Sequence, residues 1–213
     1  MEGCDIIQKN VMGNTPLAWA ALNGHEEVVR ILLERDEIEP DKPGQYGRTP
    51  LQWAAIVGCE TVVKLLLGRD DVNPNKPDGD DQTPLLLAAS MGHEGVVILL
   101  LGRDDVNPDT PDEAGVTPLA QAAFFGHEGV VKLLLGRGDV NPDKPDNHGR
   151  NPIGWAAYNG HEEVVKMLLG RDDVDPTKPD HKGRTPLRCA AENGHPGAMA
   201  LLQPPTIATH STT

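Results

Sequence analysis

The chain has 213 residues, with 19 Lys and Arg against 32 Asp and Glu, so its formal net charge is −13. This charge repels nucleic acid phosphates and anionic lipid headgroups; it argues against a nucleic acid or membrane partner and allows a basic one. Three cysteines (Cys4, Cys59 and Cys189) without metal-site spacing argue against a disulfide framework or a zinc ribbon. No apolar run reaches the roughly 20 residues that span a bilayer, and the N-terminus lacks a targeting pattern, so we expect a cytoplasmic protein.

The sequence repeats itself every 34 residues. In register with one another come a Thr-Pro-Leu motif, a pair of alanines and a Gly-His dipeptide, which becomes Gly58-Cys59 in the second unit. A fixed period of this length is typical of stacked repeats. The motif marks six units, which begin at Thr15, Thr49, Thr83, Thr117, Asn151 and Thr185.

Each unit predicts a helix, a second helix and a loop. Thr before Pro is a favourable start for a helix, and the Gly of Gly-His is a favourable end, so the first helix is short. The second helix, for example over residues 161–169, has acidic residues in its first turn and a largely apolar remainder. The segment that follows, such as residues 171–184, is rich in Asp, Pro, Lys and Gly and predicts an extended loop with a turn.

The motif Thr-Pro-Leu-x-x-Ala-Ala-x-x-Gly-His, followed by Val-Val-x-x-Leu-Leu and Asp-Val-Asn, resembles the ankyrin repeat over nearly the whole chain. The period alone would also suit tetratricopeptide repeats, but their Trp, Gly and Tyr pattern is absent. The resemblance implies an all-α ankyrin solenoid of about six helix-turn-helix units joined by hairpin-like loops, which binds protein and needs no cofactor. Residues 47–55 and 71–76 are most similar to the ankyrin arrays of fungal NACHT-type NTPases.

The two ends depart from the repeat. The first unit lacks a clear hairpin before Asn14, and the last second helix, near Pro196, is short. We therefore expect a repeat domain over residues 1–202, whose first and last units act as caps, and a disordered polar tail over residues 203–213. Relative to the ankyrin pattern, one residue is missing near Gly-Arg-Asp-Asp-Val and about two are added near Lys-Pro-Asp, which predicts a reshaped hairpin tip.

Positions that change between units are candidates for recognition, whereas constant positions serve the stack. Trp19, Trp53 and Trp155 share one slot beside the paired alanines, and we expect them to pack. The two positions before Gly-His are apolar in the central units and polar at the ends. In ankyrin-like proteins the tips and first helices line a concave face, which implies a binding strip with aromatic anchors. Its residues are Tyr46, Arg48, Ile56, Val57, Met91, Phe124, Phe125, His148, Arg150, Tyr158, Lys182 and Arg184.

A plainer interpretation is that one residue of each variable pair packs between repeats. The sequence gives even less support to a metal site or a catalytic site. Each histidine of the Gly-His motif lies in a different unit, so we expect no metal site and instead a capping or hydrogen-bonding role at the second helix. The loop beginning at Asp71 lacks the Gly and Glu of a calcium loop. No nucleophile elbow or Walker sequence occurs, and we expect Cys59 to be a buried residue at a helix start.

We therefore expect a non-catalytic protein or peptide recognition module. The alternative is a structural or autoregulatory segment of a larger NACHT-type receptor. A monomer is expected, with self-association as the second outcome if the apolar strip is uncovered.

Overall fold

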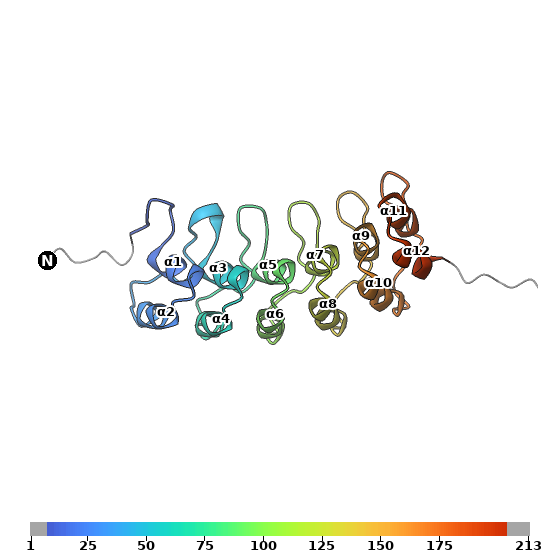
Figure 1. Cartoon of the computed structure of the whole chain (residues 1–213). Helices are drawn as coiled ribbons and strands as arrows, with labels where there is room; N and C mark the ends of the chain where they lie inside the picture. Colours follow the sequence, from blue (N-terminus) through green and yellow to red (C-terminus); the bar gives the residue numbers. More distant parts are fainter. Residues whose placement is uncertain (1–7, 204–213) are drawn as a thin grey trace, which may run out of the picture.

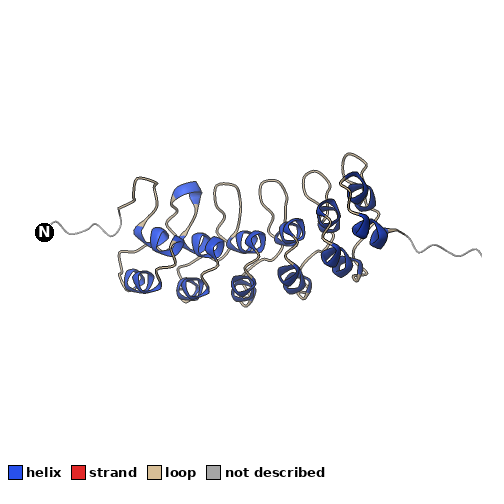
Figure 2. Ribbon diagram, in the orientation of Figure 1, coloured by secondary structure: helices blue, strands red, loops and turns tan. Residues whose placement is uncertain are grey.

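Twelve α-helices form a single stack of six helix pairs in the computed structural model, which describes residues 8–203. The pairs follow one another along the chain, and a long loop joins each pair to the next (Figure 1). No strand occurs within residues 8–203 (Figure 2). The all-α solenoid of six units predicted from the repeat is confirmed. The predicted tail lies outside the described residues apart from Gln203.

The helices lie in two rows. First helices pack against first helices, and second helices against second helices (Figure 1). The first helices are α1 (Pro16–Leu22), α3 (Pro50–Val57), α5 (Pro84–Met91), α7 (Pro118–Phe125), α9 (Pro152–Asn159) and α11 (Pro186–Glu192). The second helices are α2 (Glu26–Leu33), α4 (Glu60–Leu67), α6 (Glu94–Leu101), α8 (Glu128–Leu135), α10 (Glu162–Leu169) and α12 (Pro196–Leu202), and a short 3₁₀ helix, η1 (Gln45–Gly47), lies in the second hairpin.

Local chemistry sets the limits of the first helices. The Thr15 hydroxyl accepts a hydrogen bond from the Ala18 N–H at 3.1 Å, and Asn151 takes the same role in the fifth unit. Gly58 ends α3 with a left-handed backbone (φ 74°), where a side chain would be strained. A Cβ there would also come within 2.6 Å of the His93 ring. The predicted starts and ends of these helices are thus confirmed.

The core runs through the stack because the second helices and paired alanines of the first five units repeat a similar buried face, whereas in the sixth unit Ala190 and Ala198 are buried and Ala191 is exposed. Ala54, Ala55 and Leu66 have no exposed surface, and the equivalent residues of the next three units are buried as well. The small alanines let neighbouring first helices approach closely, and each buried Leu contributes about 2–3 kcal/mol of transfer free energy. The stack is therefore held by contacts between neighbours.

A second set of repeated contacts lies along the second helices. Arg103 donates to the Leu67 carbonyl of the preceding unit at 3.0 Å and forms a two-bond ion pair with Asp105. The equivalent arginines after the other second helices make the same bonds, so the second to fifth units each cover the open C-terminal end of the previous second helix. The arginines are Arg69, Arg103, Arg137 and Arg171.

The histidines of the Gly-His motif connect units, which corrects the expected capping role. None of their side chains caps its own helix. Instead the Nε2 of His93, His127 and His161 lies 2.9–3.0 Å from a backbone carbonyl at the end of the preceding first helix. Cys59 takes this position in the second unit and is only partly buried, contrary to expectation.

The expected packing of the shared tryptophan slot holds in only part of the stack. Trp53 is 7% exposed, whereas Trp19 is 42% exposed. Two features distinguish these rings. The Arg48 guanidinium lies 5.1 Å from the Trp53 ring, where the first unit has the shorter Asn14, and within residues 8–203 no first helix precedes α1.

Candidate functional site

The hairpin tips and the first helices form one surface, which we call the inner face. The tips are the five residues before each N-cap: 10–14, 44–48, 78–82, 112–116, 146–150 and 180–184. Backbone hydrogen bonds connect neighbouring tips: the Asn147 N–H donates to the Ala114 carbonyl, and the His181 N–H to the His148 carbonyl, both at 2.9 Å. The tips therefore form a continuous ladder on one side of the stack (Figure 1).

An aspartate, buried in three cases and partly buried in the fourth, shapes four of these tips from within. In the fifth tip, Asp146 accepts hydrogen bonds from the backbone N–H groups of His148 and Arg150 at 2.8 and 2.9 Å. Asp78, Asp112 and Asp180 make the same pair of bonds in their own tips. Such Asx turns fix the loop, so the side chains that project from the tips are held on an ordered backbone.

The variable pairs before Gly-His divide into a packing residue and an exposed residue. Ile56 packs against the core, whereas Val57, which follows it, is 40% exposed. Met91 and Phe125 occupy the same position as Val57 and are 50% and 49% exposed. The second residue of each central pair thus lies on the inner face, and the first serves the stack, as the plainer interpretation predicted for one member.

Aromatic side chains of the fourth and fifth units form a connected cluster. The Phe124 ring contacts the rings of Phe125 and Trp155 edge-on, with centroids 4.8 and 5.0 Å apart. Trp155 in turn contacts Tyr158 at 6.1 Å. Edge-to-face pairs of this kind add about 0.5–1.5 kcal/mol beyond burial. Phe124, Trp155 and Tyr158 are partly buried, so the cluster is anchored in the stack and open on one side.

Two arginines from the tips lie over tryptophans of the first helices. The guanidinium carbon of Arg150 is 3.6 Å from the centre of the Trp155 ring, within stacking distance. Arg48 lies over Trp53 and also 5.4 Å from the centre of the Tyr46 ring. In both units the tip and the first helix form one surface, in which a cation meets an aromatic ring.

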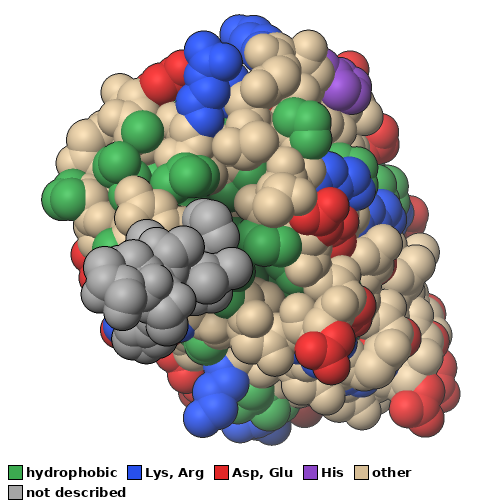
Figure 3. All heavy atoms as spheres, turned by 90° about the vertical axis from the view of Figure 1, so that its right-hand side faces the viewer, with side chains coloured by type: hydrophobic (Ala, Val, Ile, Leu, Met, Phe, Trp, Pro, Cys, Tyr) green, Lys and Arg blue, Asp and Glu red, His purple; other side chains and the backbone are tan. Residues whose placement is uncertain are grey.

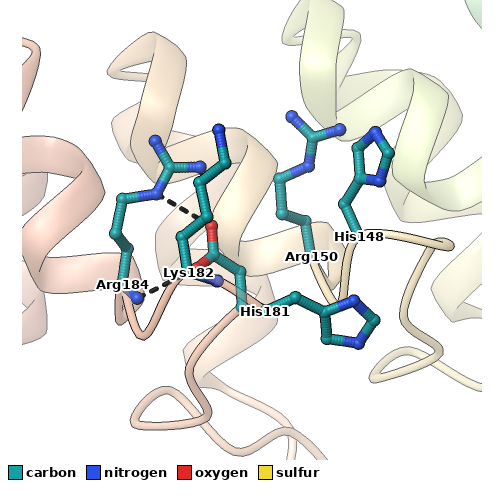
Figure 4. A pocket seen from close by; sticks show the side chains of 6 residues that line it. His148, Arg150, His181, Lys182 and Arg184 are labelled. Carbon is teal, nitrogen blue, oxygen red and sulfur yellow. Dashed lines mark hydrogen bonds and ion pairs between the residues drawn. The ribbon is translucent and has the colours of Figure 1, made fainter.

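The fifth and sixth tips enclose a shallow pocket of about 300 Å³. In Figure 4 the charged ends of Arg150, Lys182 and Arg184 extend to the same side of the loops, toward the first helices. Arg184 is paired to Asp180 at 2.6 Å. Burial opposes ionisation of Asp180, but the bonds from the Arg184 side chain and the backbone outweigh it, so the pKa of Asp180 lies below its ordinary value. The pocket is lined by His148, Arg150, Asp180, His181, Lys182 and Arg184.

Charge changes sign along the tips. Residues 78–82 carry three carboxylates and residues 112–116 carry two, and neither tip contains Lys or Arg. Asp80, Asp112 and Glu113 line an acidic hollow between them. Seen from the C-terminal end in Figure 3, Lys, Arg and His side chains gather at the top, the side on which Figure 1 draws the tips. The tips are therefore acidic in the middle units, whereas tip 146–150 pairs Asp146 with Arg150 and tip 180–184 has Lys182 and Arg184 against Asp180 alone.

The predicted strip residues fall into three groups. Tyr46 and Arg48 lie around Trp53; Phe124, Phe125 and Tyr158 belong to the aromatic cluster; and four residues line the cationic pocket, namely His148, Arg150, Lys182 and Arg184. Ile56, Val57 and Met91 lie between the first two groups along the sequence. The predicted strip did not include Trp155 or His181, which belong to the aromatic cluster and to the pocket. The spacing of five residues from Arg150 to Trp155, repeated from Arg48 to Trp53, is the signal that could have indicated the stacking.

A family model described as ankyrin repeats, in three copies, matches residues 1–78, 70–146 and 138–210. Together these matches cover almost the whole chain, including all twelve helices. The chain belongs to the ankyrin repeat family. Ankyrin repeats generally mediate protein–protein interactions and are typically non-catalytic. No curated protein matches the chain, so the narrower resemblance to fungal NACHT-type NTPases rests on sequence motifs alone. None of the helices in residues 8–203 of this ankyrin repeat protein has the length and apolar character needed to cross a membrane.

Proposed function

We propose that this ankyrin repeat domain is a non-catalytic recognition module that binds a protein or peptide partner on its inner face. The exposed aromatic cluster of the fourth and fifth units carries the proposal. Phe125 is 49% exposed although its neighbour Phe124 packs on Trp155, so a large apolar side chain is presented on an ordered base. Aromatic anchors surrounded by polar groups are typical of the energetic centres of interfaces.

The remaining predicted residues surround this centre. Val57 and Met91 extend the apolar surface toward the second unit, and Tyr46 and Arg48 lie at its far end. A net charge of −13 and the acidic middle tips favour a partner with basic groups there. A specific complex on this scale would bury roughly 800 Å² per partner. We propose further that the domain works in the cytoplasm as a monomer and binds neither nucleic acid nor membranes nor metal.

The test is capture of crosslinked partners from native cytosol by wild-type domain and by the variant Phe125→Ala. We expect the variant to weaken binding by about 2 kcal/mol, or roughly thirtyfold in Kd, because an aromatic anchor is truncated at the centre of the interface. Phe124 is less suitable for this comparison because it packs on Trp155, and its loss would also disturb the stack.

The matched control is Ile98→Ala. Ile98 is 54% exposed and lies on α6, in the other row of helices. Its truncation removes a similar exposed apolar group and should leave capture unchanged. Equal capture by wild type and Phe125→Ala would overturn the proposed centre, whereas a loss with both variants would indicate general apolar adhesion.

A structural or autoregulatory role within a larger NACHT-type receptor is the second candidate. The exposed side chains of α2 favour it: Val28 and Ile31 are each 47% exposed, whereas Val62, which occupies the position of Val28, is fully buried. An apolar surface of this kind suits contact with another domain. This role predicts that Val28→Lys, and not Phe125→Ala, changes the behaviour of the longer protein.

A further inference from the structure

We propose that the fifth and sixth units recognise an acidic segment of the partner. An Asp or Glu side chain of that segment would enter the pocket between tips 146–150 and 180–184, and an adjacent apolar side chain would pack on Phe125 and Trp155. This inference rests on the proposed function and specifies the chemistry of the partner at one end of the inner face. It differs from the basic groups expected at the middle tips.

The pocket offers donors that the fold itself leaves unused. Arg150 gives only its Nε to Asp146, so both of its Nη groups make no hydrogen bond within residues 8–203. Arg184 gives Nε and Nη2 to a single oxygen of Asp180 and keeps Nη1. The Lys182 ammonium group makes no ion pair in the described part of the chain. A carboxylate placed here would accept charge-assisted hydrogen bonds from two units at once.

The two arginines are held in place before any ligand arrives. Asp146 and Asp180 have side chains only 2% and 4% exposed, and each holds one guanidinium group through an ion pair. Arg150 is further held against the Trp155 ring at 3.6 Å. Because the planar groups are already oriented, binding would order few further side-chain torsions, which favours affinity. The same ion pairs keep the local charge modest, so Lys182 supplies most of the unpaired positive charge.

The neighbourhood of the pocket selects the kind of acidic ligand. The Arg150 guanidinium covers Trp155, and Trp155 contacts Phe124, which contacts Phe125, so the cationic pocket is continuous with the aromatic cluster. A segment that joins a carboxylate to an apolar side chain matches both parts. A nucleic acid would match the cations but would meet the acidic tips 78–82 and 112–116 along the same face, at a net chain charge of −13.

The charges of the neighbouring tips also set the orientation of the bound segment. Carboxylates of the partner are repelled by Asp80 and Glu113 at the middle tips and attracted at the last two. Complementary potentials of this kind fix the orientation of a bound segment more than they raise its affinity. The acidic end of the partner segment is therefore placed over the fifth and sixth units.

The test uses a displayed library of random 12-residue peptides and the whole chain. Peptides selected by wild type should be enriched in Asp and Glu next to an apolar residue. Lys182→Glu should weaken their binding about tenfold, the size expected for one hydrogen bond to a charged group. Lys182 uses only its backbone N–H within the fold, so this change leaves the tip intact. The control Lys132→Glu makes the same charge change on α8, away from the pocket, and should leave binding unchanged.

The outcomes separate this inference from the proposed function. Selected peptides that depend on Phe125 but show no acidic enrichment, and that bind Lys182→Glu as well as wild type, would overturn the inference and leave the recognition module standing. Peptides that bind equally well to Phe125→Ala would overturn both. Equal weakening by Lys182→Glu and Lys132→Glu would show a general charge effect and would also contradict the pocket. Tighter binding of a single-stranded RNA probe than of acidic peptides would assign the cations to phosphate.

Discussion

The stack has two edges, one formed by the second helices and one by the hairpin tips, and they differ in how constant their residues are from unit to unit. Along the second helices, Arg69, Arg103, Arg137 and Arg171 make the same bonds to the preceding unit. At the tips, equivalent positions hold different residues, so that Asp80, Ala114, His148 and Lys182 follow one another. The repeated edge fixes the geometry between units, and the changing edge carries what distinguishes one unit from the next. Residues that do not hold the stack are free to serve a partner.

The tips themselves contain both kinds of residue. Asp146 and Asp180 close their turns with identical hydrogen bonds, whereas His148 and Lys182 project from the same turns without side-chain bonds in the described chain. The division between scaffold and recognition therefore falls between neighbouring residues as well as between the two edges. Substitutions of residues that hold the stack should change the free energy of unfolding, whereas substitutions of the projecting residues should change affinity for a partner.

The largest effect is expected in the core. Leu100 on α6 has no exposed surface, and Leu100→Ala should lower the free energy of unfolding by about 3 kcal/mol through lost burial and the cavity left behind. Urea unfolding monitored by circular dichroism measures this change. Phe125→Ala, at a changing position, should lower it by less than about 1 kcal/mol. Similar losses for the two variants would mean that Phe125 belongs to the core.

A smaller loss is expected from the repeated edge. Arg103→Ala removes the hydrogen bond to the Leu67 carbonyl and should destabilise the domain by about 1 kcal/mol in the same unfolding experiment. Arg188 is the comparison, because among residues 8–203 its only side-chain partner is Glu192 on its own helix. An effect of Arg188→Ala equal to that of Arg103→Ala would contradict the connecting role of the arginine ladder.

An increase in stability is expected from one substitution in the loops. Asp109 accepts the Asn141 N–H through Oδ2, but its buried Oδ1 has no partner within residues 8–203. Asn75, at the equivalent position, donates to the Asp105 carbonyl at 2.5 Å. Asp109→Asn can make the same bond, and it should stabilise the domain by about 1 kcal/mol at pH 7.

The gain from Asp109→Asn should depend on pH. Burial raises the pKa of Asp109 above its ordinary value, so the ionised form disfavours folding, and wild type loses stability as the pH rises through that raised pKa. The advantage of the amide is therefore full above the raised pKa, shrinks as the pH falls through that pKa, and is smallest below about 4, where the carboxyl is protonated in both states. Unfolding at pH 7 and pH 3 measures the difference. A gain that is equal at both pH values would contradict the role of ionisation.

The smallest effect is expected at Ile98. The equivalent residues are Arg30, Lys64, Lys132 and Lys166 in four of the other second helices and Ala200 in α12, so Ile98→Lys restores the commonest residue. It would lie one turn from Glu94, as Lys64 lies from Glu60 at 3.6 Å. We expect stability to change by less than about 0.5 kcal/mol and binding to stay constant. A marked loss of binding would place a second contact surface on the second helices.

Most of the fold could be predicted because the local signals that begin and end the first helices recur in five of the six units. Thr-Pro fixes where a first helix begins, and Gly-His fixes where it ends, whatever the partner of that unit. The connecting role of His93 could not be predicted, because its hydrogen bond joins it to Ile56 in another unit, 37 residues away. For the same reason, the partial burial of Cys59 could not be predicted.

Most residues of the candidate site could be predicted from the sequence, but the way they lie together in space could not. Exposure at the variable pairs followed from their change between units, and Val57, Met91 and Phe125 are exposed as expected. The gathering of His148, Arg150, Lys182 and Arg184 around one pocket depends on how two hairpins lie beside each other, which no single repeat encodes. The burial of Trp53 and the exposure of Trp19 likewise involve groups outside their shared slot, such as the Arg48 guanidinium over Trp53.

The most direct test of the division between the two edges is amide hydrogen exchange of the wild-type domain with and without a selected peptide. Binding should slow exchange at tips 112–116, 146–150 and 180–184 and in α7 and α9, and leave the second helices unchanged. Slower exchange centred on α4, α6 and α8, with unchanged tips, would contradict the assignment of recognition to the changing edge.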